Sequence, residues 1–134
     1  MISFDAFRAQ NDLPIYLQIL RYIKRGIVAG EITEGDALPS RRMLSALLGV
    51  NPNTVQKTYR ILEQEGLITS HAGAKSVIVL TEDTQARLRR ELLIGDLRTT
   101  IDALKRMGLT LDEARELLAQ CWEMPTTPVE EESE

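Results

Sequence analysis

The stretch from Gly49 to Gly66 carries both a start and a stop signal for one short helix, and it limits the possible folds more than any other part of the chain. Asn51 is a residue type that caps helix N-termini, and Pro52 fits the first helical position. Gly66 suits the left-handed conformation that ends a helix. The apolar residues between these signals recur at helical spacing, which predicts a face that packs on a core: Val55, Tyr59 and Leu62.

The opposite face of this predicted helix is polar and cationic. Its members stand at positions i, i+3, i+4 and i+7: Asn53, Gln56, Lys57 and Arg60. Amide and cationic side chains are the groups that hydrogen-bond to base edges and phosphates of DNA. A solvated helix can carry the same residues, so this face alone leaves both interpretations open.

A shorter helix is predicted immediately upstream, within residues 38–48. Ser40 is a suitable N-cap residue, and three leucines form a predicted inward stripe: Leu44, Leu47 and Leu48. Residues 49–51 then make a tight link containing a glycine. Two helices joined in this way, the second with a polar outer face, indicate a helix-turn-helix.

Two β-rich runs follow, at residues 67–70 and 77–80, and the turn between them contains Gly73. This pattern predicts a hairpin, the wing of a winged helix. We therefore expect a mostly α-helical fold with a small β wing, in which a winged helix-turn-helix is followed by two C-terminal helices.

The sequence LPSRRMLSALLGVNPNTVQKTYRILEQEGLI resembles the DNA-binding domain of the GntR family of transcription regulators. The LPS-x-R opening, the GV-x-x-x-TV turn and the EGLI exit match in order and at family spacing. PIYLQI at residues 14–19 is similar to the family's first helix, so the resemblance covers about residues 12–80. NPNTV and the short remainder resemble the YtrA-like subfamily, which implies a small helical dimerisation unit. One departure is at the wing tip, where the family usually has Gly-x-Gly but Gly73 is followed by Ala74 and Lys75.

The helix face and this resemblance together give the candidate DNA-binding residues: Ser40, Arg41, Arg42, Asn53, Thr54, Gln56, Lys57, Gly73 and Lys75. Arg41 and Arg42 begin a predicted helix, where positive charge opposes the macrodipole, so an external anion such as a phosphate is the natural partner. The family's DNA-contacting arginine falls at Arg42. Family proteins usually carry an acidic residue at the position of Arg41, which makes Arg41 the weaker candidate.

The net charge of −4 at first argues against a nucleic-acid partner, but its distribution does not. Residues 14–80 hold eight Lys/Arg and five Asp/Glu, a net charge of +3, whereas residues 81–134 hold seven and thirteen, a net charge of −6. The cationic part coincides with the predicted helix-turn-helix, and local charge decides phosphate binding. Arg21, Lys24 and Arg25 lie off the apolar stripe of the first helix and are expected to be solvated, with a phosphate contact as the alternative.

The C-terminal part predicts two helices and a tail. Residues 81–107 form one long helical pattern, and Thr110 to Glu113 read as a capping box that starts another helix. Leucine-rich stripes on the two are the candidate dimerisation residues: Leu93, Leu97, Ile101, Leu104, Leu117, Leu118 and Trp122. About 24 residues of helix span roughly 36 Å, enough to set the one-turn spacing of about 34 Å between operator half-sites. The alternative is that both stripes fold back on their own winged helix and leave a monomer.

These patterns divide the chain into a DNA-binding domain at residues 1–80, a dimerisation unit at 81–124 and a disordered acidic tail at 125–134. No run approaches the roughly 20 apolar residues of a membrane span, and the N-terminus lacks a signal-peptide pattern, so a cytoplasmic location is expected. Cys121, the single cysteine, lies on an apolar stripe and is expected to be a buried, inert thiol. With one cysteine and one histidine, we expect no metal site, and we expect no cofactor.

The leading interpretation is a sequence-specific transcription regulator, a repressor, that binds a pseudo-palindromic operator as a homodimer. An enzyme is disfavoured because the chain shows no glycine-rich phosphate loop, no G-x-S-x-G and no metal set. A winged helix used only for protein contacts is the other alternative, and it predicts an apolar or acidic outer helix face in place of the amides and cations present. The operator sequence, the regulated genes, the choice between repression and activation, and any small-molecule effector do not follow from the sequence.

Overall fold

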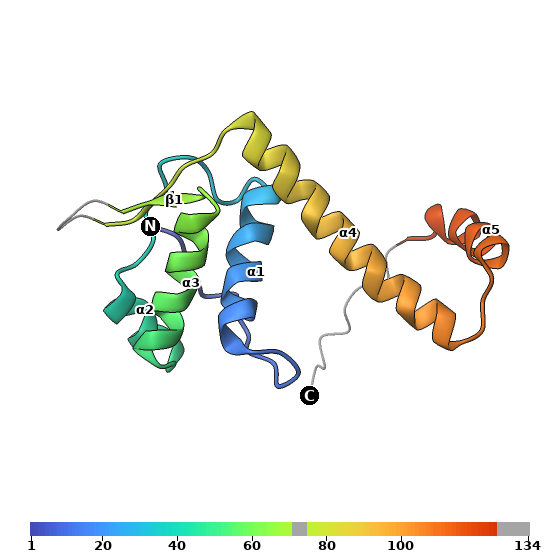
Figure 1. Ribbon diagram of the computed structural model, residues 1–134, viewed down its shortest axis with the longest axis horizontal. Coiled ribbons are helices and arrows are strands. Elements are labelled where there is room, and N and C mark those ends of the chain that lie inside the picture. The colour runs from blue at the N-terminus through green and yellow to red at the C-terminus, as the bar shows by residue number, and fades with distance from the viewer. Residues whose placement is uncertain (71–74, 126–134) are drawn as a thin grey trace. The chain divides into compact units, whose positions relative to one another are not determined.

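The computed structural model describes residues 1–70 and 75–125, and within them the chain forms two compact units that divide after Leu93. Gly73 and almost all of the predicted acidic tail lie outside the described residues. The first unit contains three helices, a two-stranded sheet and the first turns of a fourth helix (Figure 1): α1 (Ile15–Val28), α2 (Arg41–Leu48), α3 (Pro52–Gln64), β1 (Ile68–Thr69), β2 (Val77–Ile78) and α4 (Glu82–Arg106).

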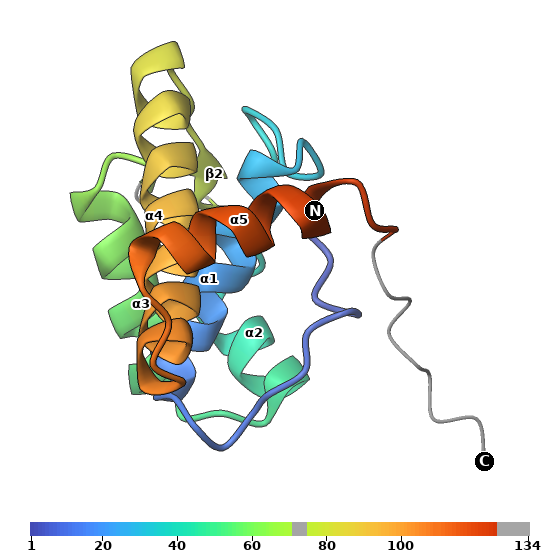
Figure 2. The same ribbon diagram turned by 90° about the vertical axis from the view of Figure 1, so that its right-hand side faces the viewer.

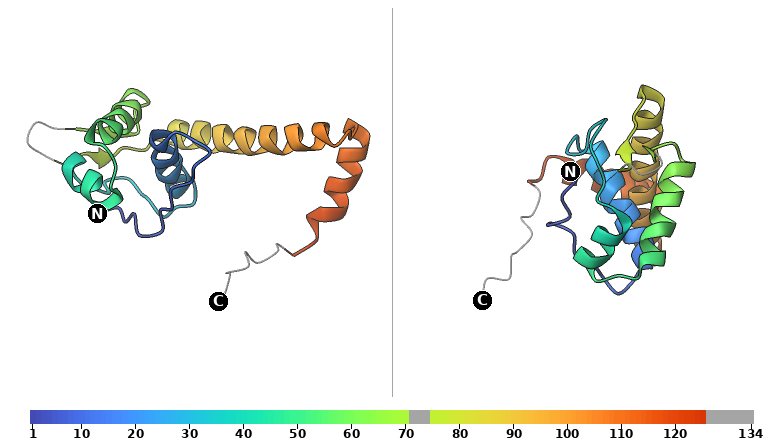
Figure 3. Two further views of the ribbon diagram at one scale, coloured as in Figure 1. Left: turned by 90° about the horizontal axis from the view of Figure 1, so that it is seen from below. Right: turned by 90° about the vertical axis from the view of Figure 1, so that its left-hand side faces the viewer.

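Helix α1 packs through one apolar stripe along α3, beside which it runs in Figures 1 and 3. Ile19, Ile23 and Ile27 stand four residues apart, so they share one face, and all three are buried. A glycine near the end of this helix leaves room for a neighbouring side chain. A Cβ atom on Gly26 would lie 2.6 Å from Cδ1 of Ile32, which packs back on α1 after the chain turns.

The helix-turn-helix forms where the local signals predict it. The Ser40 hydroxyl accepts a hydrogen bond from the backbone N–H of Met43 (3.1 Å) and starts α2. Gly49, in the left-handed conformation with φ 65°, ends α2. The Asn51 side chain then accepts from the N–H of Asn53 (2.8 Å) and starts α3. The polar side chains of Ser40 and Asn51 therefore fix where the two helices begin.

The predicted inward stripe of α2 is only partly correct. Leu44 is fully buried and Leu48 packs partly buried against the same core, but Leu47 is 63% exposed. Successive helical residues are about 100° apart around the axis, so a helix that contacts the core through Leu44 and Leu48 turns Leu47 away from it.

The wing is an antiparallel pair in which Ile68 faces Ile78 and Thr69 faces Val77. The segment before α2 lies along the other edge of β2. It forms an isolated bridge between Ala37 and Val77, and the N–H of Leu38 donates to the carbonyl of Ser76 at 2.9 Å. The wing is therefore hydrogen-bonded to the chain that leads into the helix-turn-helix, which confirms the predicted winged helix.

The core of the first unit lies under α3, whose predicted inner residues are all buried: Val55, Tyr59 and Leu62. The N-terminal segment closes one side, where Phe4 stacks on Tyr22 of α1 with ring centroids 5.2 Å apart. Helix α4 contributes Leu88, which is 3% exposed and is the buried residue of that helix.

The second unit comprises the later turns of α4 and α5 (Leu111–Trp122), which follows the end of α4 after a short turn (Figure 2). Gly108, with φ 82°, lies in that turn. The predicted capping box is present, since Thr110 Oγ1 accepts from the N–H of Glu113 and Glu113 Oε1 accepts from the N–H of Thr110.

No residue of α5 is buried within the described chain. Cys121 is exposed, so the prediction of a buried thiol is wrong for the single chain: its apolar stripe has no neighbouring surface there to cover it. Among the described residues, no helix has the length and apolarity needed to cross a membrane.

Candidate nucleic-acid interface

The outer face of α3 presents the side chains that the sequence selects for base and phosphate contacts. Asn53, Gln56, Lys57 and Arg60 are all exposed, whereas the opposite face of the same helix is buried. The burial of Val55, Tyr59 and Leu62 fixes the rotation of α3 about its axis. The polar face, on the opposite side of the helix, therefore points into solvent. Such a face on the second helix of a helix-turn-helix is suited to the major groove.

Two amide groups on this face are free to bind. Within the described residues, the side chains of Asn53 and Gln56 make no hydrogen bond. Asn51, by contrast, uses its side chain to cap the helix. Thr54 is half-buried at the start of α3, and its carbonyl accepts a hydrogen bond from the Thr58 hydroxyl (3.1 Å). An unpaired amide can offer a donor and an acceptor together, the pattern that reads adenine in the major groove.

Lys57 is held in place by a residue that the sequence analysis did not select. Its ammonium nitrogen lies 3.8 Å from the centroid of the Tyr16 ring, in the second position of α1. A cation over an aromatic face gains about 0.5–1 kcal/mol at an exposed site. Tyr16 therefore keeps the Lys57 charge at the edge between α1 and α3. PIYLQI contains Tyr16, but nothing in that motif indicates its pairing with a residue 41 positions later.

The two arginines at the start of α2 occupy different environments. Arg42 is exposed and makes no hydrogen bond or ion pair within the described chain. Arg41 is half-buried with its guanidinium carbon 5.6 Å from the centroid of the Tyr59 ring, and its buried Nε has no hydrogen-bond partner among the described residues. Arg42, next to the N-cap Ser40, is thus the arginine that extends from the helix N-terminus toward solvent.

Tyr59 connects α3, the second helix of the helix-turn-helix, to the start of α2. Its ring is 1% exposed and its hydroxyl donates to the carbonyl of Pro39 at 2.7 Å. Burial raises the pKa of Tyr59 well above its usual range, and the positive charge of Arg41 opposes that rise only in part. The phenol is therefore neutral under physiological conditions and available as a donor.

The wing offers Lys75, which is exposed and unpaired within the described residues, just before β2. Behind it, the hydroxyls of Ser70 and Ser76 lie 2.8 Å apart and join the two sides of the hairpin. Of the two candidate residues in the wing, the structure thus places Lys75. No group of three or more His, Cys, Asp or Glu side chains is arranged to hold a metal in the part of the chain that the structure describes.

Comparison with known proteins gives this interface its context. The model of the family described as bacterial regulatory proteins, gntR family, matches residues 15–78. The HTH-type transcriptional repressor YtrA of Bacillus subtilis is 41% identical over 104 residues, which cover 72% of this chain and 78% of YtrA. The chain belongs to the GntR family.

Another relative and two solved structures extend the match over 80% to 92% of the chain. YhcF of Bacillus subtilis, an uncharacterized HTH-type transcriptional regulator, is 35% identical over 80% of this chain and 88% of its own. A GntR family transcriptional regulator from Listeria monocytogenes superposes with a TM-score of 0.71 at 27% identity, covering 84% of this chain and 98% of that one. YtrA from Sulfolobus acidocaldarius, a GntR-family transcription factor, gives 0.52 at 29% identity, covering 92% and 98%. The protein is a YtrA-like, DNA-binding transcription regulator of the GntR family and not an enzyme.

Proposed function

We propose that this regulator binds a pseudo-palindromic operator as a homodimer and represses transcription from it. The observation that carries the DNA-reading part is the outer face of α3, where free amides and cations stand on a helix whose opposite face is locked in a core. In this proposal Asn53, Thr54 and Gln56 lie nearest the bases. Phosphates are contacted from α2 by Ser40, Arg41 and Arg42, and by Lys57, Gly73 and Lys75.

Exposed apolar side chains support the homodimer. On α4, Leu93, Leu97 and Ile101 follow one stripe with Leu104, and each of the first three is more than two-fifths exposed. On α5, Leu117, Leu118 and Trp122 are exposed as well, Trp122 at 76%. Apolar side chains gathered in this way usually mark an interaction site. A twofold contact between two copies would cover each stripe with its own equivalent, because the same surface serves both partners.

Repression is the part of the proposal that rests on similarity, since the Bacillus subtilis relative is named a transcriptional repressor. In this proposal a dimer bound at a promoter represses transcription by occupying the promoter DNA.

Selection of bound duplexes from random DNA tests the proposal most directly. We expect two inverted half-sites whose centres lie about one helical turn, roughly 34 Å, apart. A winged helix that serves only protein contacts would enrich no sequence. A single half-site without a partner would contradict the homodimer and leave the DNA-reading face intact.

Sedimentation of the full chain without DNA tests the dimer separately. We expect a dimer at micromolar concentration and a monomer for Leu97→Glu, because a buried unpaired charge opposes association. Thr99→Glu is the matched control, since Thr99 lies about 200° around α4 from Leu97 and so on the opposite face. A wild-type monomer, or two variants that dissociate equally, would refute the assignment of this stripe.

A further inference from the structure

Lys24 is buried, whereas the other two basic residues of α1 are exposed. Its side chain is 5% exposed in the middle of α1, while Arg21 and Arg25 are exposed. The expectation that all three are solvated is therefore wrong for Lys24. It points toward the end of α3 and the first turns of α4, two elements that no local pattern in the chain places together.

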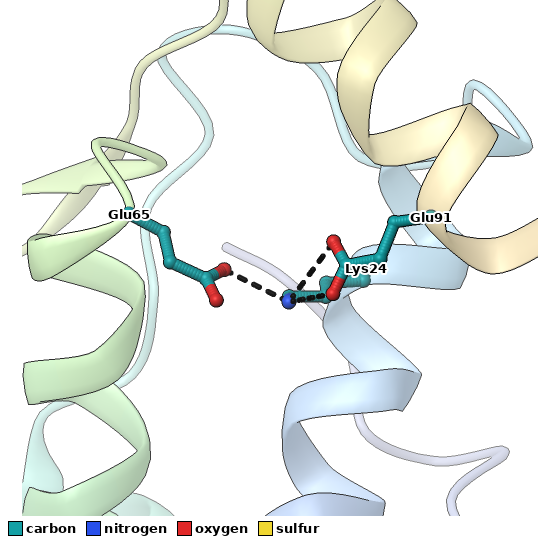
Figure 4. Close-up of polar contacts among 3 residues, drawn as sticks. All are labelled: Lys24, Glu65 and Glu91. Carbon is teal, nitrogen blue, oxygen red and sulfur yellow. Dashed lines mark hydrogen bonds and ion pairs between the residues drawn. The ribbon is translucent and has the colours of Figure 1, made fainter. Parts of the chain in front are cut away.

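Two carboxylates from two different helices meet at this one ammonium group (Figure 4). Lys24 Nζ lies 2.8 Å from Glu65 Oε2, at the C-cap of α3, and 3.2 Å from Glu91 Oε1, in α4. All three residues belong to the first unit. The cluster joins the C-cap of α3 to α4 through α1.

The position of Glu65 indicates that the cluster does not serve the stability of α3 by itself. A carboxylate at a helix C-terminus lies against the negative end of the macrodipole, where a cation is favoured. Lys24 supplies that cation from another helix. One lysine and two carboxylates give the cluster a net charge of −1. Neutralising Glu65 would need only Lys24, so it does not explain why Glu91 is also present.

We propose that Lys24 is a positioning residue for operator recognition, which fixes the direction of α4 on the recognition helix through Glu65 and Glu91. The proposal rests on the homodimer proposed above. Leu88 is the one fully buried side chain of α4. A helix anchored mainly by one buried side chain can swing about it. Glu91, three residues later on the same side, adds a second and directional attachment.

The direction of α4 matters because the same helix carries the proposed dimer stripe. Helix α4 continues without a break from Glu82 to Arg106, so Leu88, Glu91 and Leu97 lie on one element. In a dimer held through the later turns, a change in how α4 leaves the winged helix alters the separation of the two recognition helices. The operator spacing that binds best would then be less sharply defined.

The test measures binding of the full-length protein to duplexes that carry one half-site, or two half-sites at a series of separations. Glu91→Gln removes the charge from the attachment to α4 and Glu65→Gln removes it from the attachment to α3, each leaving only a neutral amide oxygen as acceptor. Lys24→Met removes both attachments while keeping an unbranched side chain in the space. Glu63→Gln is the control, because Glu63 is exposed, unpaired in the described chain, and undergoes the same change of charge.

We expect Glu91→Gln, Glu65→Gln and Lys24→Met to remain dimers and to bind the single half-site within about twofold of wild type. The best two-site duplex should be bound about fivefold more weakly, since the loss is in effective concentration and not in contacts. The preference for one separation over its neighbours should flatten. Adding Glu91→Gln to Lys24→Met should cost nothing further, because both changes remove the same contact. Hydrogen exchange of the amides at 82–93 should be faster in all three variants.

Three results would overturn the proposal: an unchanged spacing profile in Glu91→Gln, equal losses on single and paired half-sites in Lys24→Met, or the same flattening in Glu63→Gln. The first shows that Glu91 does not set direction, the second that Lys24 serves only the fold of the winged helix, and the third that charge alone is responsible. A wild-type protein that is a monomer instead refutes the homodimer on which the proposal depends, and a wild-type dimer with no preferred separation refutes the fixed half-site spacing proposed for the operator.

Discussion

Removing one oxygen atom from Tyr59 should destabilise the DNA-binding unit measurably. The Tyr59 hydroxyl donates to the carbonyl of Pro39 at 2.7 Å, and both residues are buried. In Tyr59→Phe that carbonyl loses its donor with no water to replace it. An unsatisfied buried polar group costs about 1–3 kcal/mol in the free energy of unfolding.

That loss corresponds to a large change in melting temperature. For a unit of 60–100 residues, each 1 kcal/mol lowers the midpoint by about 4–8 °C, so a decrease of about 4–24 °C is expected. Thermal unfolding followed by far-ultraviolet circular dichroism measures it. Tyr22→Phe is the matched control, because its hydroxyl donates to the carbonyl of Ser3 (2.9 Å) in an exposed bond whose loss water can replace. Equal midpoints for the two variants would refute the reasoning.

The same residue predicts a pH dependence. Burial raises the pKa of Tyr59 in the folded chain above the value of about 10 that it has when unfolded. As the pH rises, the Tyr59 phenol therefore ionises in the unfolded chain before it ionises in the folded chain. Its contribution to stability is complete below about pH 10 and declines as the pH rises further. The midpoint of the wild type should fall more steeply than that of Tyr59→Phe between about pH 9 and about pH 11. Parallel curves would show that the phenol ionises equally well in the folded state.

Three further variants probe the interface by DNA-binding assays. Gln56→Ala should lose about 1–3 kcal/mol on the best site and relax the preference at one base pair; unchanged affinity would mean that α3 presents another face. Arg42→Ala should weaken binding to all sequences alike and reduce the slope of log affinity against log salt by about one, and a sequence-dependent loss would contradict a phosphate contact. Tyr16→Leu should weaken binding by about two- to fivefold by releasing Lys57, whereas Tyr16→Phe retains the aromatic face and should not; equal losses would point to packing instead.

The parts of the fold that the sequence predicts well are those specified by neighbouring residues. Asn51 and Gly49 act within a few positions of themselves, and the capping box of α5 spans only Thr110 to Glu113. The buried face of α3 follows from helical spacing for the same reason. Such signals are local hydrogen bonds and periodicity, and they need no knowledge of the rest of the chain.

The contacts that escaped prediction join residues far apart in the chain. Lys24 pairs with a residue 67 positions later, and Lys57 meets Tyr16 of α1, where the sequence shows only an apolar stripe. A lysine between two arginines reads as solvated because spacing alone does not reveal that α4 returns to cover it. The prediction for Cys121 was wrong for a different reason. An apolar stripe on a helix predicts burial, but Cys121 is exposed in the single chain.

The burial of Leu88 has a consequence for building hybrid regulators. A winged helix excised at the end of the wing would lose Leu88 from its core, and with it Glu91. Grafting this DNA-reading module onto another effector or assembly domain therefore requires the junction to fall after Leu93, on an exposed stretch of α4, with the helical phase of the acceptor matched to it. The usable portable segment is the winged helix together with its first three turns of α4.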